Sequence, residues 1–185
     1  EGCPGSCTKT VTVNANPTCS ISGPDPVCAS SNGHVYTSSV LPAGGSVTYD
    51  WNISGNGSIV GSDTGASVTV NAGAAGSFTL TLDIIRDGCP GTCSKTVTVN
   101  ANPTCSISGP DPVCASSSGH VYTSSVLPAG GSVTYDWGIS GNGSIVGSDN
   151  NASVTVDAGG AGSFTLTLGV LRDGCPGTCS KAVTV

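Results

Sequence analysis

The amino-acid sequence repeats itself at an interval of 86 residues, so the chain is limited to folds that can be built twice in succession. Residues 14–86 and 100–172 align with nine differences in 73 positions. A third, partial copy is also present, because residues 1–13, 87–99 and 173–185 are versions of one 13-residue segment. Copies this similar are typical of neighbouring units in a tandem array. We therefore expect the chain to begin and end in the middle of a repeat.

The period divides the chain into three expected parts. Residues 14–99 (the first repeat) and 100–185 (the second repeat) each form one domain, large enough for a modest hydrophobic core. Residues 1–13 form a partial repeat that contacts a preceding unit and that contains a copy of the last strand at Thr8 to Val13. This surplus strand either belongs to a continuous covalent array or docks into a neighbouring molecule by strand addition.

Polar and apolar residues alternate with period two throughout each repeat, and no helical period competes with this pattern. Turn-forming sequences interrupt the alternation at short intervals, as in a two-sheet β-sandwich. The sequence therefore predicts an all-β chain of two tandem, seven-stranded, immunoglobulin-like β-sandwiches stapled by disulfides. The strands expected in the first repeat are residues 18–23, 33–40, 46–54, 57–61, 66–71, 77–85 and 94–99.

Aromatic residues mark the expected core. The strand at residues 46–54 places its Val, Tyr, Trp and Ile on one face. A tryptophan on the third strand of an immunoglobulin-type sandwich fills the space between the two sheets. A second inward row begins with a phenylalanine. We interpret these residues as packing rather than as a ligand-stacking surface, and the expected core residues are Trp51, Trp137, Phe78 and Phe164.

Ten cysteines in so short a chain indicate disulfides formed in an oxidising, extracellular compartment. The cysteines form three C-x3-C pairs and two C-x8-C pairs. Pairing within each pattern uses all ten, whereas pairing between the patterns leaves two unpaired. We therefore expect local bridges, with a bridge between neighbouring domains as the alternative. The expected bridges are Cys3–Cys7, Cys19–Cys28, Cys89–Cys93, Cys105–Cys114 and Cys175–Cys179.

The last hairpin of each repeat poses a problem of register. If the chain turns at Gly91, Asp83 lies opposite Val99, and the apolar row of one strand faces the polar row of the other. One extra residue corrects the match, so we expect a glycine-type bulge at Asp87-Gly88 and another at Asp173-Gly174.

We find no motif for catalysis, metal binding or a cofactor, and we expect no enzyme activity. His34 lies on an expected strand without a nucleophile motif beside it. The C-x3-C spacing differs from the usual zinc knuckle. An isopeptide bond would need a buried lysine beside a carboxyl group, and we expect the lysines to be exposed. The aspartates are scattered along the sequence and match no calcium-loop pattern. These residues are Lys9, Lys95, Lys181, Asp25, Asp50, Asp63, Asp83 and Asp87.

The charge balance excludes some partners. Charged residues make up 9% of the chain and the net charge is −6, so a surface that neutralises phosphates is missing. No apolar stretch reaches the length of a membrane span. We expect no nucleic acid and no membrane insertion. The expected partners are copies of the chain itself, with surface glycans as a further candidate.

The sequence contains four blocks that resemble PKD-like and immunoglobulin-like modules of secreted and surface-anchored bacterial proteins: NPTCSISGPDPVCASS, VTYDWNISGNGSIVG, ASVTVNAGAAGSFTLTL and DGCPGTCSKTVTVN. The resemblance covers essentially the whole chain. It implies β-sandwich modules of stalks, spacers and adhesive or matrix proteins that have no catalytic residues.

We expect a structural, extracellular or cell-surface protein that forms a stiff fibre, stalk or filament. The linker at residues 100–103 is short and contains proline, which limits swinging. One alternative is an adhesin or glycan-binding module that uses inter-strand loops, where the repeats differ at Asn52/Gly138 and at Thr64-Gly65/Asn150-Asn151. Another is an accessory domain beside a catalytic neighbour.

Overall fold

The computed structural model describes residues 2–185, so Glu1, the first residue of the expected partial repeat, lies outside the described residues. The described chain is all β and contains no helix. It divides into two compact units. Unit 1 extends to Pro26 and includes residues 30–73 and 77–98, and unit 2 comprises residues 27–29, 74–76 and 99–185. The domain limits that we expect from the repeat, 14–99 and 100–185, remain a prediction.

The first repeat forms all seven expected strands, because each alternating segment has one apolar face to bury. The structure adds a two-residue strand, β2, which is too short to give a sequence signal. It also starts the last strand, β8, at Cys89 instead of residue 94. The strands are β1 (Thr18–Ser22), β2 (Val27–Cys28), β3 (His34–Leu41), β4 (Val47–Gly55), β5 (Gly57–Val60), β6 (Ser67–Ala72), β7 (Gly76–Arg86) and β8 (Cys89–Asn100).

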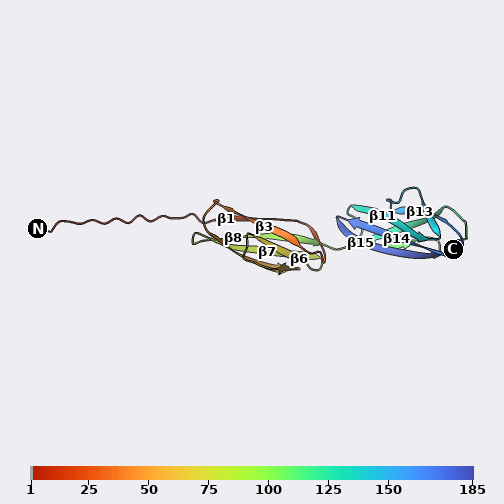
Figure 1. Cartoon of the computed structure of the whole chain (residues 1–185), viewed down its shortest axis with the longest axis horizontal. Coiled ribbons are helices and arrows are strands. Elements are labelled where there is room, and N and C mark those ends of the chain that lie inside the picture. Colours follow the sequence, from red (N-terminus) through yellow and green to blue (C-terminus); the bar gives the residue numbers. More distant parts are fainter. Residues whose placement is uncertain (1) are drawn as a thin grey trace. The chain divides into compact units, whose positions relative to one another are not determined.

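The strands of each repeat form two sheets, as expected for a β-sandwich (Figure 1). In the first repeat the sheet orders are β1-β3-β6-β5 and β2-β8-β7-β4, and β2 runs parallel to β8. In the second repeat they are β12-β13-β10-β9 and β11-β14-β15. The strands of the second repeat are β9 (Thr104–Ser108), β10 (His120–Leu127), β11 (Val133–Gly141), β12 (Gly143–Val146), β13 (Ser153–Ala158), β14 (Ser163–Arg172) and β15 (Cys175–Thr184).

The core of each sandwich lies between its two sheets. Trp51 and Phe78 are each 1% exposed, and their counterparts Trp137 and Phe164 are 3% and 1% exposed. Phe78 packs edge-on against the ring of Tyr36, with 6.0 Å between ring centroids. Such edge-to-face contacts suit the positive edge and negative face of aromatic rings. These aromatic side chains are therefore almost completely buried between the two sheets.

The bulge predicted in the last hairpin is wrong. In the second repeat Arg172 pairs with Cys175 and Phe164 pairs with Val183, so the register is constant along the hairpin. The chain reverses in a two-residue turn at Asp173-Gly174, where both residues have positive φ angles of 51° and 81°. Asp-Gly is a preferred sequence for such a type I′ turn. Because the turn lies there, the apolar rows match without an extra residue.

In its described residues, the partial copy at the N-terminus forms no strand within this chain, and its expected contact with a preceding unit remains a prediction. The structure assigns no strand to residues 8–13, where one was expected. Val11 and Val13 are 70% and 90% exposed, whereas their counterparts in β8, Val97 and Val99, are 0% and 3% exposed. A strand needs a neighbour for its N–H and C=O groups. Residues 2–13 have no neighbouring strand in the described chain.

Candidate functional site

The disulfides do not follow the local pairing expected from the sequence. Cys19 of β1 bonds Cys93 of β8, with 5.7 Å between their Cα atoms. The equivalent bond in the second repeat joins Cys105 to Cys179. Each bond links the two sheets of its sandwich, because β1 and β8, like β9 and β15, belong to different sheets.

The local pairing fails because the CPGTC segment is part of a strand rather than a turn. Cysteines four residues apart on an extended strand are separated by about 13 Å, far beyond the reach of a disulfide. Gly177, the central residue of the segment, lies inside β15. A Cβ at the equivalent Gly91 would lie 2.6 Å from the carbonyl oxygen of Pro17. The glycine is therefore needed for a close backbone approach and not for a turn.

A third disulfide joins the two repeats and matches the alternative left open by the sequence. Cys28 of the first repeat bonds Cys175 of the second, across 147 positions of the chain. Residues 27–29 belong to unit 2, where the N–H of Ala29 donates to the Asn100 carbonyl at 2.8 Å. The Asn102 side-chain amide donates to the Ala29 carbonyl at 3.1 Å. The disulfide and these hydrogen bonds tie residues 27–29 to the linker and to β15.

Four cysteines expected in disulfides are free thiols in the structure. Cys3 and Cys7 lie in the exposed N-terminal segment, and Cys114 is also exposed. Cys89 is half-buried, with its Sγ atom 3.8 Å from the carbonyl oxygen of Asn14. The expectation that all ten cysteines are paired within this chain is therefore wrong.

Each histidine contacts a serine hydroxyl. The Nε2 atom of His34 lies 2.7 Å from the Ser31 Oγ atom, and His120 and Ser117 repeat this contact at 2.7 Å. Among the described ion pairs, none joins a histidine to a carboxylate. A serine nucleophile usually also needs a third group to orient its base. Each contact lies at the start of its strand, β3 or β10.

Two of the five aspartates considered as calcium ligands, Asp25 and Asp87, hold a strand and a turn instead. Asp25 accepts the Thr98 N–H of β8 at 3.0 Å and lies 3.7 Å from the Lys95 ammonium. Asp87 accepts the Ser46 N–H at 2.9 Å. Residues 2–185 contain no group of three or more side chains arranged to hold a metal.

The buried tyrosines are neutral hydrogen-bond donors. The Tyr36 hydroxyl donates to the Pro24 carbonyl at 2.9 Å, and Tyr122 makes the same bond to Pro110. Burial, with a smaller effect of the nearby Asp25 charge, raises the pKa of Tyr36 to about 12. Burial and Asp111 likewise raise the pKa of Tyr122. Both hydroxyls therefore stay protonated at neutral pH and fix the loop before their strands.

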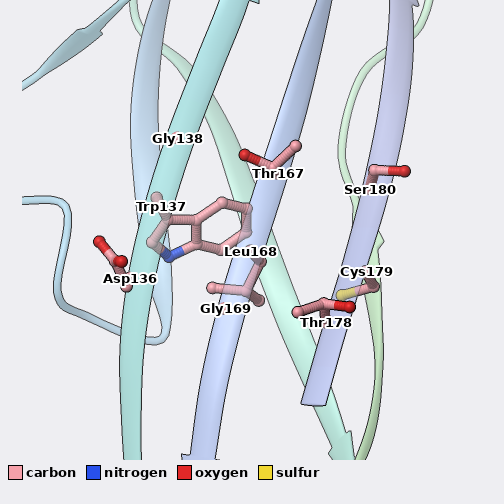
Figure 2. A pocket seen from close by; sticks show the side chains of 9 residues that line it. All are labelled: Asp136, Trp137, Gly138, Thr167, Leu168, Gly169, Thr178, Cys179 and Ser180. Atoms are coloured by element: carbon pink, nitrogen blue, oxygen red, sulfur yellow. The ribbon is translucent and has the colours of Figure 1, made fainter. Parts of the chain in front are cut away.

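A surface hollow of about 590 Å³ lies on the outer face of β11, β14 and β15 (Figure 2). Its floor includes Gly138 and Gly169, where the first repeat has Asn52 and Asp83. Gly169 is the cross-strand partner of Asp136, whereas Asp83 faces Asp50 in the first repeat. The hollow is bordered by the polar residues Asp136, Thr167, Thr178 and Ser180, together with Trp137, Leu168 and Cys179.

The loop in which the repeats differ is held by the core tryptophan. The indole N–H of Trp51 donates to the Gly65 carbonyl at 2.8 Å, and that of Trp137 donates to the Asn151 carbonyl at 2.8 Å. The loop backbone is therefore fixed in both repeats while its side chains change. Sequence comparison identified these variable positions, but the hollow depends on which strands lie side by side.

The two sandwiches, their inter-sheet disulfides and their repetition define a tandem immunoglobulin-like protein. The sequence model of the family described as "PKD-like domain" matches residues 11–100 and again residues 100–185. The chain therefore belongs to the PKD-like domain family. Tandem domains of this kind are typical of extracellular structural or adhesion modules and are generally non-catalytic. The disulfides also favour an extracellular location.

Solved structures with the same fold have low sequence identity. The first eight immunoglobulin domains of the Down Syndrome Cell Adhesion Molecule match with a TM-score of 0.53 and 15% identity, over 92% of this chain and 27% of that chain. Three N-terminal domains of the Highly Immunogenic Outer Capsid protein of bacteriophage RB49 match with a TM-score of 0.50 and 15% identity, over 91% and 59%. These likenesses show the fold alone.

No curated protein sequence matches this chain significantly. Within residues 2–185 we find no helix with the length and apolar character needed to cross a membrane.

Proposed function

We propose that this protein is a structural, non-catalytic extracellular component of a stiff fibre, stalk or filament built from copies of the PKD-like repeat. The observation that carries the proposal is the disulfide between Cys28 and Cys175, which joins consecutive repeats. A protein that only displayed independent binding modules would need no covalent bond between repeats other than the chain itself.

The linker supports the same proposal. Residues 100–103 contain a proline. Two residues of this linker, Asn100 and Asn102, each form a hydrogen bond with Ala29. A segment constrained by hydrogen bonds and a nearby disulfide has fewer accessible conformations than a free linker. We expect this constraint to limit bending between repeats.

The proposed partners are further copies of the repeat, supplied by a continuous chain or by another molecule. Residues 2–13 support this proposal because they copy β8, whose Val97 and Val99 are buried, yet expose their own Val11 and Val13. A segment of this kind can complete a sheet when a partner offers an edge.

Negative-stain electron microscopy of the native material tests the proposed function. We expect long, thin filaments with a regular bead for each repeat. Native material consisting of dispersed single molecules, at concentrations where the repeats are folded, would contradict the fibre.

A glycan-binding or adhesive role is the second candidate, and the hollow on β11, β14 and β15 favours it. Polar side chains around a shallow hollow can hydrogen-bond sugar hydroxyls. Its test is a glycan array with the variant Gly138→Asn/Gly169→Asp, which gives the second repeat the residues of the first. We expect binding to be lost in this variant and kept in the matched control Asn52→Gly/Asp83→Gly. Absence of binding by the unmodified protein, or equal binding by both variants, would contradict a site at the hollow.

A further inference from the structure

We infer that Cys114 and Cys89 are each one half of a further disulfide between repeats. Cys114 would bond the counterpart of Cys175 in a following copy, and Cys89 would bond the counterpart of Cys28 in a preceding copy. The inference rests on the proposed array in one respect, that further copies of the repeat are present. One complete example of the bond, Cys28–Cys175, is already in the structure.

The repeat period relates the free cysteines to the bonded ones. Cys114 follows Cys28 by 86 residues, and Cys89 precedes Cys175 by 86 residues. Each free thiol is therefore the copy of a cysteine that is bonded elsewhere in the same chain. The two remaining free cysteines follow the same rule, because Cys3 is another copy of Cys175 and Cys7 is a copy of the bonded Cys93.

The loop that carries Cys114 already has the conformation of the loop that carries Cys28. The N–H of Ser30 donates to the Gly73 carbonyl at 2.9 Å, and the N–H of Ser116 donates to the Gly159 carbonyl at 2.7 Å. Both serines have positive φ angles, 59° for Ser30 and 58° for Ser116. The unbonded loop therefore needs no rearrangement before it forms the bond.

The segment before Cys114 is also docked on its sheet in the same way. The N–H of Val113 donates to the Thr184 carbonyl at 3.0 Å, and Asp111 accepts the Thr184 N–H at 3.0 Å. In the first repeat Val27 pairs with Val99, and Asp25 accepts the Thr98 N–H at 3.0 Å. Cys114 is therefore held at the surface by fixed neighbours, and it is exposed where the bonded Cys28 is half-buried.

The hairpin that carries Cys89 repeats the hairpin that carries Cys175. Asp87 and Gly88 have φ angles of 48° and 82°, close to the 51° and 81° of Asp173 and Gly174. Cys175 is 1% exposed in its disulfide, whereas Cys89 is only half-buried. The environment of Cys89 thus lacks the cover that residues 27–29 give to Cys175.

Bond formation is an oxidation of two thiols. One S–S bond forms, two S–H bonds break, and two protons and two electrons pass to an oxidant, which we take to be a small-molecule disulfide that is reduced to two thiols. The step proceeds by thiolate attack through a mixed disulfide. Its consequence is that a proteolytic cut in the linker between repeats would leave those repeats covalently joined.

The test uses the full chain extended by one further copy of residues 100–185 after Val185. The protein is oxidised with a small-molecule disulfide and its free thiols are then alkylated and counted by mass. We expect the number of free thiols to stay at four, as in the present chain. Two additional free thiols, on Cys114 and on the added counterpart of Cys175, would overturn the inference. Formation of Cys19–Cys93 and Cys105–Cys179 checks that the extended chain has folded.

A variant and a second arm complete the experiment. In the extended chain, Cys114→Ser should expose the added counterpart of Cys175 to alkylation and leave Cys28–Cys175 intact. The unextended chain is oxidised at high concentration and separated without reductant. A ladder of disulfide-linked oligomers that disappears in Cys114→Ser would show that Cys114 bonds a second molecule. If the unextended chain stays monomeric while the extended chain forms the bond, the partner of Cys114 lies in the same chain. Free Cys114 in both arms overturns the inference.

The same measurements separate this inference from the proposed fibre. Filaments whose repeats keep Cys114 as a free thiol would remove the disulfide and leave the fibre. Complete disulfide formation in native material that shows no filaments would remove the fibre and leave the disulfide.

Discussion

Residues 2–13 and strand β8 have nearly the same sequence but adopt different structures. β8 lies between β2 and β7 in its sheet, and its Val97 is fully buried. The counterpart Val11 is 70% exposed in a segment without a strand. The difference teaches that the alternating pattern supplies the capacity to form a strand, while a neighbouring edge and an apolar surface decide whether the strand forms.

The largest expected difference is between deletion of the last copy of this segment, residues 173–185, and deletion of the first copy, residues 1–13. Removing residues 173–185 eliminates β15, which pairs along the whole of β14, and exposes the core around Trp137. We expect the second sandwich to unfold, as measured by tryptophan fluorescence and limited proteolysis. Removing residues 1–13 should leave both sandwiches folded, because residues 2–13, the part of this segment that the structure describes, are exposed and cover no core. A folded second sandwich after the first deletion would contradict the assigned role of β15.

A buried charge should distinguish the two copies at a single position. We expect Val97→Asp to destabilise the first sandwich by about 4 kcal/mol, because the carboxylate enters a fully buried site without a partner. The matched variant Val11→Asp should stay within about 0.5 kcal/mol of the parent, as is usual for exposed positions. Denaturant unfolding monitored by circular dichroism measures both. Equal losses for the two variants would show that Val11 is packed in solution.

The inter-sheet disulfide provides the next comparison. Cys93→Ser removes the bond to Cys19 and should cost about 2–4 kcal/mol, because the unfolded chain regains the entropy of a long loop. Cys7→Ser changes the copy of this residue that is unbonded in the structure and should have no measurable effect. Thermal unfolding without reductant gives the difference. The gap between the variants should close when a reductant is added, and a gap that persists would contradict its origin in the disulfide.

The smallest expected difference concerns a lysine. Lys95 of β8 lies 3.7 Å from Asp25 in a partly exposed ion pair, which is worth about 0.2–1 kcal/mol. We expect Lys95→Ala to lower the free energy of unfolding by this amount at low salt, and less at high salt because ions screen the pair. Lys9→Ala, at the exposed copy, should be neutral at both salt concentrations. An effect of Lys95→Ala that does not depend on salt would point to lost packing instead.

Much of each sandwich could be predicted from local pattern. The strand at residues 46–54 was predicted because one face of the alternation is apolar, and the structure places it at Val47–Gly55 with Trp51 buried. The hairpin turn was misplaced because Gly91 resembles a turn residue, although it lies within β8 and is required there by the approach of Pro17. The local signal that marks the true turn is the Asp87-Gly88 pair, because Asp-Gly is preferred in two-residue hairpin turns.

The candidate sites depended more heavily on tertiary structure. The hollow requires Gly138 and Gly169 to lie on adjacent strands, a relation set by the β11–β14 register. Cysteine spacing suggested economical local pairs, but Cys19 and Cys93 are brought together from 74 positions apart by the packing of two sheets. Sequence spacing carries no information about which strands face one another across a core.

The sequence by itself determined the repeat, the all-β character and the inward rows of each strand, because alternation and turn residues act within a few positions of the chain. The tertiary structure decided which cysteines meet and which copy of the closing segment becomes a strand. The physical reason is that a disulfide and a buried strand both require partners distant in sequence, and only the folded chain brings those partners within bonding distance.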